Sequence, residues 1–415
     1  MRHTFKFSIV ITILFFSSIF SSYSQNYGDT LNLKLTNFHK QEALPGFAAA
    51  IVDLNGMLYQ KTIGYADIES KRPYTNKTMQ CIASTTKTTI AYAVMKLQEE
   101  GELSLESPIN DFLPFKVIHP FYKDSVIKIK HLVTHTSGIK DTENNYDLRC
   151  YYFTENTDLK ESQLPKEDLD WFVMMKKNRK ISLESYFHNI FSEKGKWNQS
   201  DTFHKEPFAE HYTYTNVGAG LMAYIIERIT GHPFDKYITK NVFQKLGMKE
   251  STFDEYKVNP ELLVTSYVSE SKVATPSLGF INYPDGGIHT NIEELSLYLI
   301  EMIKGYNGES DLLTQESFKQ MMSPFLSEEV AATNAKQKTF NNIGVFWQMD
   351  DNGSIKHYGG NPLGGTVYFS FNPKTNIGKI LMTNSEAQAS RSSIVEFISI
   401  WRTMEKYEAL LPNNI

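Results

Sequence analysis

The sequence is poor in the features that mark several protein classes. It has only 2 cysteines among 415 residues, Cys81 and Cys150, which is too few for the disulfide framework of a small secreted domain. The two could pair with each other or remain as two buried thiols. The net charge is −5 at pH 7, and no basic stripe or polybasic tract stands out. We therefore expect neither a nucleic acid nor an anionic membrane surface as a partner.

Long apolar runs are also missing, with one short exception at the start. Phe7–Phe20 is uncharged and follows two basic residues, but it is shorter than the ~20 residues that a membrane-spanning helix needs. Ser22-Tyr23-Ser24 then provides a small-x-small cleavage site. This order predicts a signal peptide over residues 1–24, cleaved near Ser24-Gln25. We expect a periplasmic or secreted protein with no stable membrane span in the mature chain; an uncleaved anchor is the alternative.

Strand patterns occur near both ends of the chain, and helical patterns fill the middle. Asn55-Gly56 is a strong hairpin signal between the apolar segments 46–54 and 57–63. Strands are also predicted over residues 343–349, 354–358, 366–371 and 377–383, with helices over residues 29–41 and 391–407. The sequence thus predicts an α+β fold in which both chain ends build one antiparallel sheet, flanked by helices, and an all-α region is inserted between them. We place the α/β part at about 29–83 and 341–410, and the helical part at about 84–340.

The middle of the chain shows three helix starts. One begins at Ser84, one follows Asn216 and stops at Gly231, and one follows the predicted capping box Thr290-Asn291-Ile292-Glu293. Residues 141–211 are polar and aromatic, and we expect loops and short helices there.

The spacing Ser-x-x-Lys could hold a nucleophile and its base, and it occurs at least four times. Ser84–Lys87 lies where a β region turns into a helix, so both side chains share a face beside free backbone N–H groups. Packing against an apolar helix face would lower the pKa of Lys87 and let its amine act as a base. Ser125–Lys128 lies in an alternating segment, 124–130, that predicts a strand with the two side chains on opposite faces. Ser137–Lys140 and Ser269–Lys272 lie in loop-like stretches.

Two later stretches could complete a site around Ser84. Tyr214-Thr215-Asn216 precedes a helix, and in an extended approach its tyrosine and asparagine project on one side, where they could relay a proton and bind a carbonyl. Asn216 could equally be an ordinary helix N-cap. His357-Tyr358-Gly359-Gly360 ends a predicted strand, where glycines allow a substrate backbone to approach closely. A hairpin corner with an incidental histidine is the alternative.

In this order, the three stretches resemble the motifs of the serine β-lactamase and penicillin-binding-protein family, and most closely its class C β-lactamase-related branch. Residues 131–138 and 284–288 look similar too, and the resemblance covers about residues 35–400. It implies an α/β sandwich beside an all-α domain, with the site between them and no cofactor. The implied activity is cleavage of an amide or ester in a small molecule or peptide, such as a D-amino-acid peptide or a β-lactam.

The resemblance also implies roles for individual residues. Ser84 would be the acylated nucleophile, with Lys87 and Tyr214 as its proton-transfer partners. Asn216 would hold the substrate's amide, while His357 and Gly359 would form the far wall of the site. The backbone N–H groups of Ser84 and Gly360 would form the oxyanion hole.

Three departures from the family pattern bear on substrate choice. His357 replaces the lysine of classical β-lactamases, which makes the chain look more like the D-aminopeptidase, DD-peptidase and esterase relatives. The usual Pro-Gly before the tyrosine is missing, and residues 141–211 would reshape the mouth of the cleft. A histidine titrating near its ordinary pKa of ~6.5 would lose its charge over about pH 6–8, so activity on carboxylate-bearing substrates would fall there.

Two further possibilities remain open at this level. His131 and His135 have the i, i+4 spacing of zinc ligands, but they lack the glutamate of the zinc-protease pattern, so a structural role is preferred. A non-catalytic protein that binds or senses peptidoglycan or another ligand on the same fold is the alternative to an enzyme. The complete set of candidate residues favours chemistry.

Overall fold

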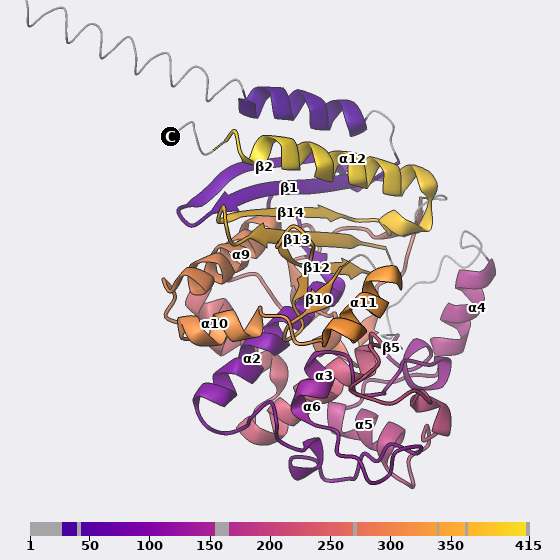
Figure 1. Cartoon of the computed structure of the whole chain (residues 1–415). Coiled ribbons are helices and arrows are strands. Elements are labelled where there is room, and N and C mark those ends of the chain that lie inside the picture. The colour runs from indigo at the N-terminus through magenta and orange to yellow at the C-terminus, as the bar shows by residue number, and fades with distance from the viewer. Residues whose placement is uncertain are drawn as a thin grey trace, which may run out of the picture.

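The fold is known from a computed structural model, which describes residues 27–39, 43–153, 166–268, 272–337, 340–361 and 364–411. The predicted signal peptide and Ser269 lie outside these residues. An eight-stranded antiparallel sheet forms the upper part of Figure 1. Its spatial order is β10 (Asn342–Ile343), β11 (Gln348–Met349), β12 (Ile355–Gly360), β13 (Thr366–Asn372), β14 (Ile377–Thr383), β1 (Gly46–Asp53), β2 (Gly56–Asp67) and β3 (Arg72–Pro73).

The central strand β1 is buried on both faces, which explains its unbroken apolar sequence. Its odd-numbered residues, such as Phe47 and Ile51, pack with the helix over residues 27–39 and with α12 (Arg391–Glu408). Its even-numbered residues, such as Ala48, face the large core that includes α9 (Ile292–Asn307). Period-2 alternation thus sends successive side chains into two different cores.

A mainly helical region lies below the sheet in Figure 1. Helices α2 (Lys87–Glu99) and α6 (Asn216–Thr230) bury consecutive residues, and therefore every face, over most of their length, and their apolar residues belong to the same core as the lower sheet face. The other helices of this part are α3 (Ile129–Val133), α4 (Lys166–Met175), α5 (Leu183–Phe191), α7 (Phe234–Ile238), α8 (Gln244–Leu246), α10 (Gln315–Met321) and α11 (Glu328–Gln337). Short strand pairs join β4 (Gln80–Cys81) to β9 (His289–Thr290), β5 (Tyr151–Tyr152) to β8 (Gly279–Phe280), and β6 (Tyr267–Val268) to β7 (Val273–Ala274). The predicted α+β fold with an inserted helical region is confirmed.

Most of the predicted strands and hairpins are confirmed. The Asn55-Gly56 turn joins β1 to β2, with Gly56 at a φ of 142°. Gly353 turns between β11 and β12 at a φ of 81°. The single strand predicted over residues 343–349 is wrong, because the chain folds back on itself there. Phe346 adopts a left-handed φ of 56°, and β10 and β11 pair with each other as a tight hairpin.

Two local predictions in the helical region are also wrong. Asn291, not Thr290, caps α9: its Oδ1 accepts the N–H of Glu294 at 3.0 Å. The segment 124–130 is not a strand but a turn, followed by one isolated bridge at Lys128 and the start of α3. Alternation of apolar residues over so short a stretch did not distinguish the two structures.

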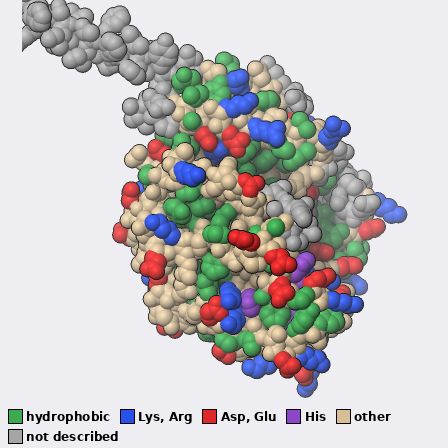
Figure 2. All heavy atoms as spheres, viewed as in Figure 1, with side chains coloured by type: hydrophobic (Ala, Val, Ile, Leu, Met, Phe, Trp, Pro, Cys, Tyr) green, Lys and Arg blue, Asp and Glu red, His purple; other side chains and the backbone are tan. Residues whose placement is uncertain are grey.

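The surface, the thiols and the helix lengths bear on further expectations from the sequence. Acidic and basic side chains are interspersed over the face shown in Figure 2. Cys81 and Cys150 are not bonded to each other; Cys150 is buried and Cys81 is partly buried. Within the described ranges, no helix combines the length and the apolar character that crossing a membrane would require.

Candidate active site

Ser84 lies in η1 (Ala83–Thr86), a short 3-10 turn that runs directly into α2. Ala83, just before it, has a φ of 46°, a left-handed conformation that residues with a Cβ seldom adopt. Backbone strain of this kind concentrates at functional sites. The Ser84 side chain is partly exposed and lines a cavity of about 230 Å³. It therefore has the exposed hydroxyl that a nucleophile needs.

The side chain of Lys87 is completely buried beneath Ser84. Its Nζ lies 3.0 Å from Ser84 Oγ, 2.7 Å from Asn216 Oδ1 and 2.7 Å from the backbone oxygen of Asp285. Burial lowers the pKa of Lys87 to about 8, although the carboxylates of Asp285 and Asp141 act in the opposite direction. An appreciable fraction of this amine is therefore neutral near physiological pH, as the sequence predicted.

The contacts of Lys87 also orient its amine. A neutral amine has two hydrogens and one lone pair, and Asn216 Oδ1 and the Asp285 carbonyl can only accept. If the two hydrogens go to these oxygens, the lone pair faces Ser84 Oγ. The geometry can thus remove the hydroxyl proton of Ser84, which is the task of a general base.

Tyr214 completes the group of proton-carrying side chains. Its hydroxyl hydrogen-bonds the Ser84 side chain, and Lys87 Nζ lies 5.1 Å from the centre of its ring. Burial raises the pKa of Tyr214, so the phenol keeps its proton and can donate it. The ring of His135 packs 4.5 Å away, and its Nδ1 accepts the N–H of Thr215 at 3.3 Å. His135 thus supports the tyrosine rather than a metal.

Asn216 could be either a substrate-binding side chain or an ordinary helix N-cap, and the structure shows that it is not the N-cap of α6. Thr215 is the cap, since its Oγ1 accepts the N–H of Gly218 at 3.0 Å. The Asn216 side chain instead accepts from Lys87 and donates Nδ2–H to Asp141 Oδ2 at 2.9 Å. It lines the cavity beside Ser84, where the second hydrogen of its Nδ2 group could meet a substrate carbonyl.

Strand β12 brings the glycine-rich stretch against the turn of the nucleophile. A Cβ built on Gly359 would lie 2.3 Å from the oxygen of Ile82 and 3.1 Å from the nitrogen of Ser84. Only a residue without a side chain allows so close an approach. Gly360 follows and lines the same cavity as Ser84, so the two backbone groups predicted for the oxyanion hole share one cavity.

His357 differs from its sequence-based interpretation. It is 1% exposed and does not line the cavity at Ser84. Its Nδ1–H donates to the oxygen of Tyr358 at 2.8 Å, and burial, assisted by the positive charge of Lys87, lowers its pKa to about 3. The expectation that His357 loses a charge between pH 6 and 8 is therefore wrong, because the ring is neutral throughout that range.

Two buried carboxylates belong to the site although sequence reasoning did not assign them a role. Asp141 accepts the N–H groups of Asn216 and Val217, both at 2.9 Å, and so fixes the start of α6. Asp285 lies 3.9 Å from Lys87 Nζ, and burial raises its pKa to about 7 despite that neighbour. Asp285 lies within the stretch 284–288 that resembled the family, and Asp141 lies just after the stretch 131–138. No spacing in the sequence links either residue to Lys87.

The rival serines and the histidine pair form no comparable site. Ser137 is buried, and its Oγ accepts the N–H of Ile139 two residues later. Ser125 lies in an exposed turn. The nitrogen Nδ1 of His131 accepts the N–H of Lys128, and in the part of the chain that the structure describes no group of side chains is arranged to hold a metal ion.

Comparisons with known proteins identify the family of the chain. The family model described as Beta-lactamase matches residues 31–394. Protein flp of Staphylococcus aureus (strain NCTC 8325) is 24% identical over 348 residues, which make up 83% of this chain and 60% of that protein. The putative penicillin-binding protein PbpX of Bacillus subtilis (strain 168) is 25% identical over 296 residues, or 71% of this chain and 62% of PbpX. The chain thus spans less than two thirds of these relatives.

Solved structures share the fold. The octameric penicillin-binding protein homologue from Pyrococcus abyssi matches with a TM-score of 0.68 at 22% identity, over 91% of this chain and 77% of that one. The penicillin binding protein from Bacillus halodurans matches with a TM-score of 0.63 at 23% identity, over 90% and 99%. The Beta-lactamase/D-alanine Carboxypeptidase from Yersinia pestis, complexed with citrate, gives 0.61 at 17% identity, over 94% and 98%. The family resemblance inferred from the motifs is confirmed.

The substitution Gly359→Ala tests the contact between β12 and η1. Its Cβ would meet the backbone of Ile82 and push the strand from Ser84, so we expect the acylation rate of Ser84 to fall about 100-fold, the size of a lost oxyanion donor. The measurement is the rate of labelling by a fluorophosphonate. Gly28→Ala, where a Cβ meets nothing within 4 Å, is the matched control. Equal rates in both variants would show that the close approach has no role.

Proposed function

Since the chain belongs to the beta-lactamase family, we propose that it is an exported serine hydrolase that cleaves an amide or ester bond through an acyl-enzyme on Ser84. The bond belongs to a small molecule or peptide, and a D-amino-acid peptide, an ester or a β-lactam would each fit this chemistry. One observation carries the proposal: the buried Lys87 amine, with its lowered pKa, lies 3.0 Å from a partly exposed serine hydroxyl.

The proposed reaction begins with the neutral amine of Lys87. It takes the proton of the Ser84 hydroxyl while Oγ attacks the carbonyl carbon of the substrate. The carbonyl oxygen gains the negative charge and is held by the N–H groups of Ser84 and Gly360. The bond to the leaving group then breaks, and Tyr214 donates its proton to the departing nitrogen or oxygen. Tyr214 then recovers a proton from the Lys87 ammonium. Acylation is now complete, and water hydrolyses the ester on Ser84.

The buried charges support this sequence of proton transfers. Lys87 becomes an ammonium after the first step, and the carboxylates of Asp285 and Asp141 stabilise that charge at short range. Asn216 is held by Asp141 and holds Lys87 in turn, so the base keeps its place while its charge changes. Preorganised partners of this kind lower the cost of moving charge during the reaction.

A covalent adduct on Ser84 is the direct test of the proposed nucleophile. Incubation with a fluorophosphonate or a fluorescent penicillin should add the mass of the probe to the peptide that contains Ser84, because the activated hydroxyl attacks both. The variant Ser84→Ala should show no adduct, and Ser137→Ala should label like the wild type. Saturable binding of peptidoglycan fragments without any adduct or turnover would instead favour the non-catalytic binding protein.

Export rests on the sequence pattern of residues 1–24, and it has its own test. When the full chain is expressed in a bacterial host with a periplasm, we expect mature protein whose first residue is Gln25 in the periplasmic or culture fraction. Edman sequencing or mass spectrometry of the fractionated protein measures this. A chain that keeps its first residues and sediments with membranes would identify an uncleaved anchor instead.

A further inference from the structure

A second, larger cavity adjoins the one at Ser84. Its volume is about 490 Å³, and Tyr151, Phe280 and Asn361 line both cavities. Ligand pockets usually have volumes of ~300–1,000 Å³, so the smaller cavity of about 230 Å³ is too small to hold a whole substrate. A substrate that reacts at Ser84 must therefore extend, and the larger cavity offers the adjoining space.

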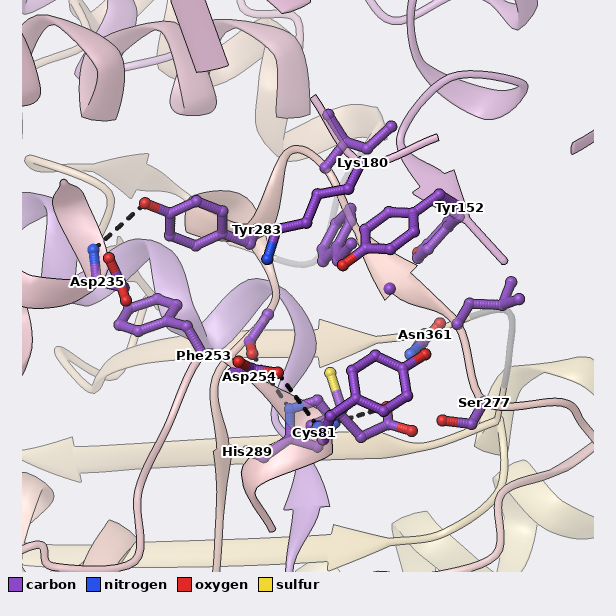
Figure 3. Close-up of a pocket in the computed structure, with 18 of the residues that line it drawn as sticks. Cys81, Tyr152, Lys180, Asp235, Phe253, Asp254, Ser277, Tyr283, His289 and Asn361 are labelled. Carbon is purple, nitrogen blue, oxygen red and sulfur yellow. Dashed lines mark hydrogen bonds and ion pairs between the residues drawn. The ribbon is translucent and has the colours of Figure 1, made fainter. Parts of the chain in front are cut away.

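Aromatic rings form much of the wall of the larger cavity. Tyr152, Phe253, Tyr256 and Tyr283 line it, and Figure 3 shows Tyr152 on one side of the pocket and Tyr283 and Phe253 on the other. Phe253 and Tyr283 pack edge to face, with their ring centres 5.4 Å apart, which keeps both rings in place. Ring faces of this kind attract cations as well as apolar groups.

The charged residues of this wall are mainly acidic. Glu227, Asp235, Asp254 and Glu255 line the cavity, against one lysine, Lys180, and one histidine, His289. The Lys180 side chain reaches between Tyr283 and Tyr152 in Figure 3 but is exposed. The cavity therefore carries an excess of negative charge that a cationic group could balance.

Two of the four carboxylates are committed to the fold. Glu227 Oε1 accepts the N–H of Phe234 at 2.8 Å and the hydroxyl of Tyr283 at 3.1 Å. Glu255 Oε2 lies 3.1 Å from His289 Nε2. These contacts hold the wall together, so the carboxylates of Glu227 and Glu255 are already occupied and less available to a ligand.

Asp235 and Asp254 are held less firmly. Asp235 pairs at 3.3 Å with Lys236, which is 61% exposed, and Asp254 pairs at 3.3 Å with Lys257, which is 60% exposed. Asp254 Oδ1 also accepts the N–H of Tyr256 at 3.2 Å. Exposed ion pairs contribute little stability, so a ligand cation can displace these lysines at small cost.

The nucleophile side of the site offers no counterpart for an anion among the described residues. His357 is buried and neutral, and the amine of Lys87 already contacts three oxygens. The charged residues that line the smaller cavity are Asp147 and Asp285. A substrate carboxylate placed there would face these two acidic side chains, and no basic side chain of the described residues lines this cavity.

We propose that the larger cavity binds the acyl part of the substrate and selects an acyl group that ends in a primary ammonium, attracted by the negative charge of Asp235 and Asp254 in the wall and held against the aromatic rings. This inference rests on the proposed function of Ser84. The acyl side is assigned because Asn216, which would hold the substrate's amide, lines the smaller cavity that shares wall residues with the larger one. A leaving group must instead lie beside its proton donor, and Tyr214 lines neither cavity. The enzyme would thus act on amine-bearing acyl esters or amides and disfavour those that end in a carboxylate.

Three p-nitrophenyl esters of similar length test this selectivity: 6-aminohexanoate, heptanoate and the half ester of adipate. They end in an ammonium, a methyl group and a carboxylate, and they share one leaving group. We expect kcat/KM to be highest for the ammonium ester, about 10-fold above that of the methyl ester. A preference of this size corresponds to one cation–π contact together with one partly exposed ion pair. The carboxylate ester should be the poorest. A wild-type enzyme that favours the methyl or the carboxylate ester would overturn the proposal.

Variants locate the selectivity in the cavity. The double variant Asp235→Asn/Asp254→Asn should lower the ratio of ammonium to methyl ester about 5- to 10-fold, whereas Lys180→Gln should raise it. Asp311→Asn, an exposed carboxylate between α9 and α10, is the control and should leave the ratio unchanged. An unchanged ratio in the double variant would contradict the assignment of these carboxylates. Fluorophosphonate labelling of Ser84 distinguishes a failure of this inference from a failure of the proposed function. If Ser84 is labelled but the enzyme shows no preference for the ammonium ester, only the inference about the larger cavity is wrong. If Ser84 is not labelled, the proposed function itself is wrong.

Discussion

The burial of the Lys87 amine is the constraint on which the rest of the site depends. An ammonium removed from water is costly unless it is paired and hydrogen-bonded, and here the surroundings supply three oxygen contacts and two nearby carboxylates. The balance lowers the pKa of Lys87 to about 8 but not further. If the carboxylates were absent, the amine would be neutral and poorly able to hold a proton. If burial were absent, it would be charged and unable to take one.

Each partner of Lys87 comes from a different part of the chain, so the fold has to be complete before the site exists. Ser84 and Lys87 belong to η1 and α2, Asn216 to the start of α6, and Asp285 to the turn that precedes β9. The sheet adds Gly359 and Gly360 from β12, which approaches η1 closely because it has no side chain there. The site is thus formed where the sheet built from both chain ends meets the inserted helical region.

Local patterns in the sequence predicted the elements and the main chemical groups, whereas longer-range packing decided the rest. The Asn-Gly turns and alternating strands specify their own hairpins, and Ser84, Lys87, Tyr214 and Asn216 were found because their motifs are short. Asp141 and Asp285 were missed because their partners lie 75 and 198 residues away. His357 was misread for the same reason: its burial depends on elements that sequence spacing does not place around it.

The pKa of Lys87 decides most directly whether its amine can act as the base. It can be measured by titrating the ε-methylene signals of ¹³C-labelled lysine by NMR, with the variant Lys87→Met identifying the signal that belongs to this residue. We expect a midpoint near pH 8, well below the ordinary value for lysine. A midpoint above about 10, the ordinary value for lysine, would show that the amine is not poised to act as the base.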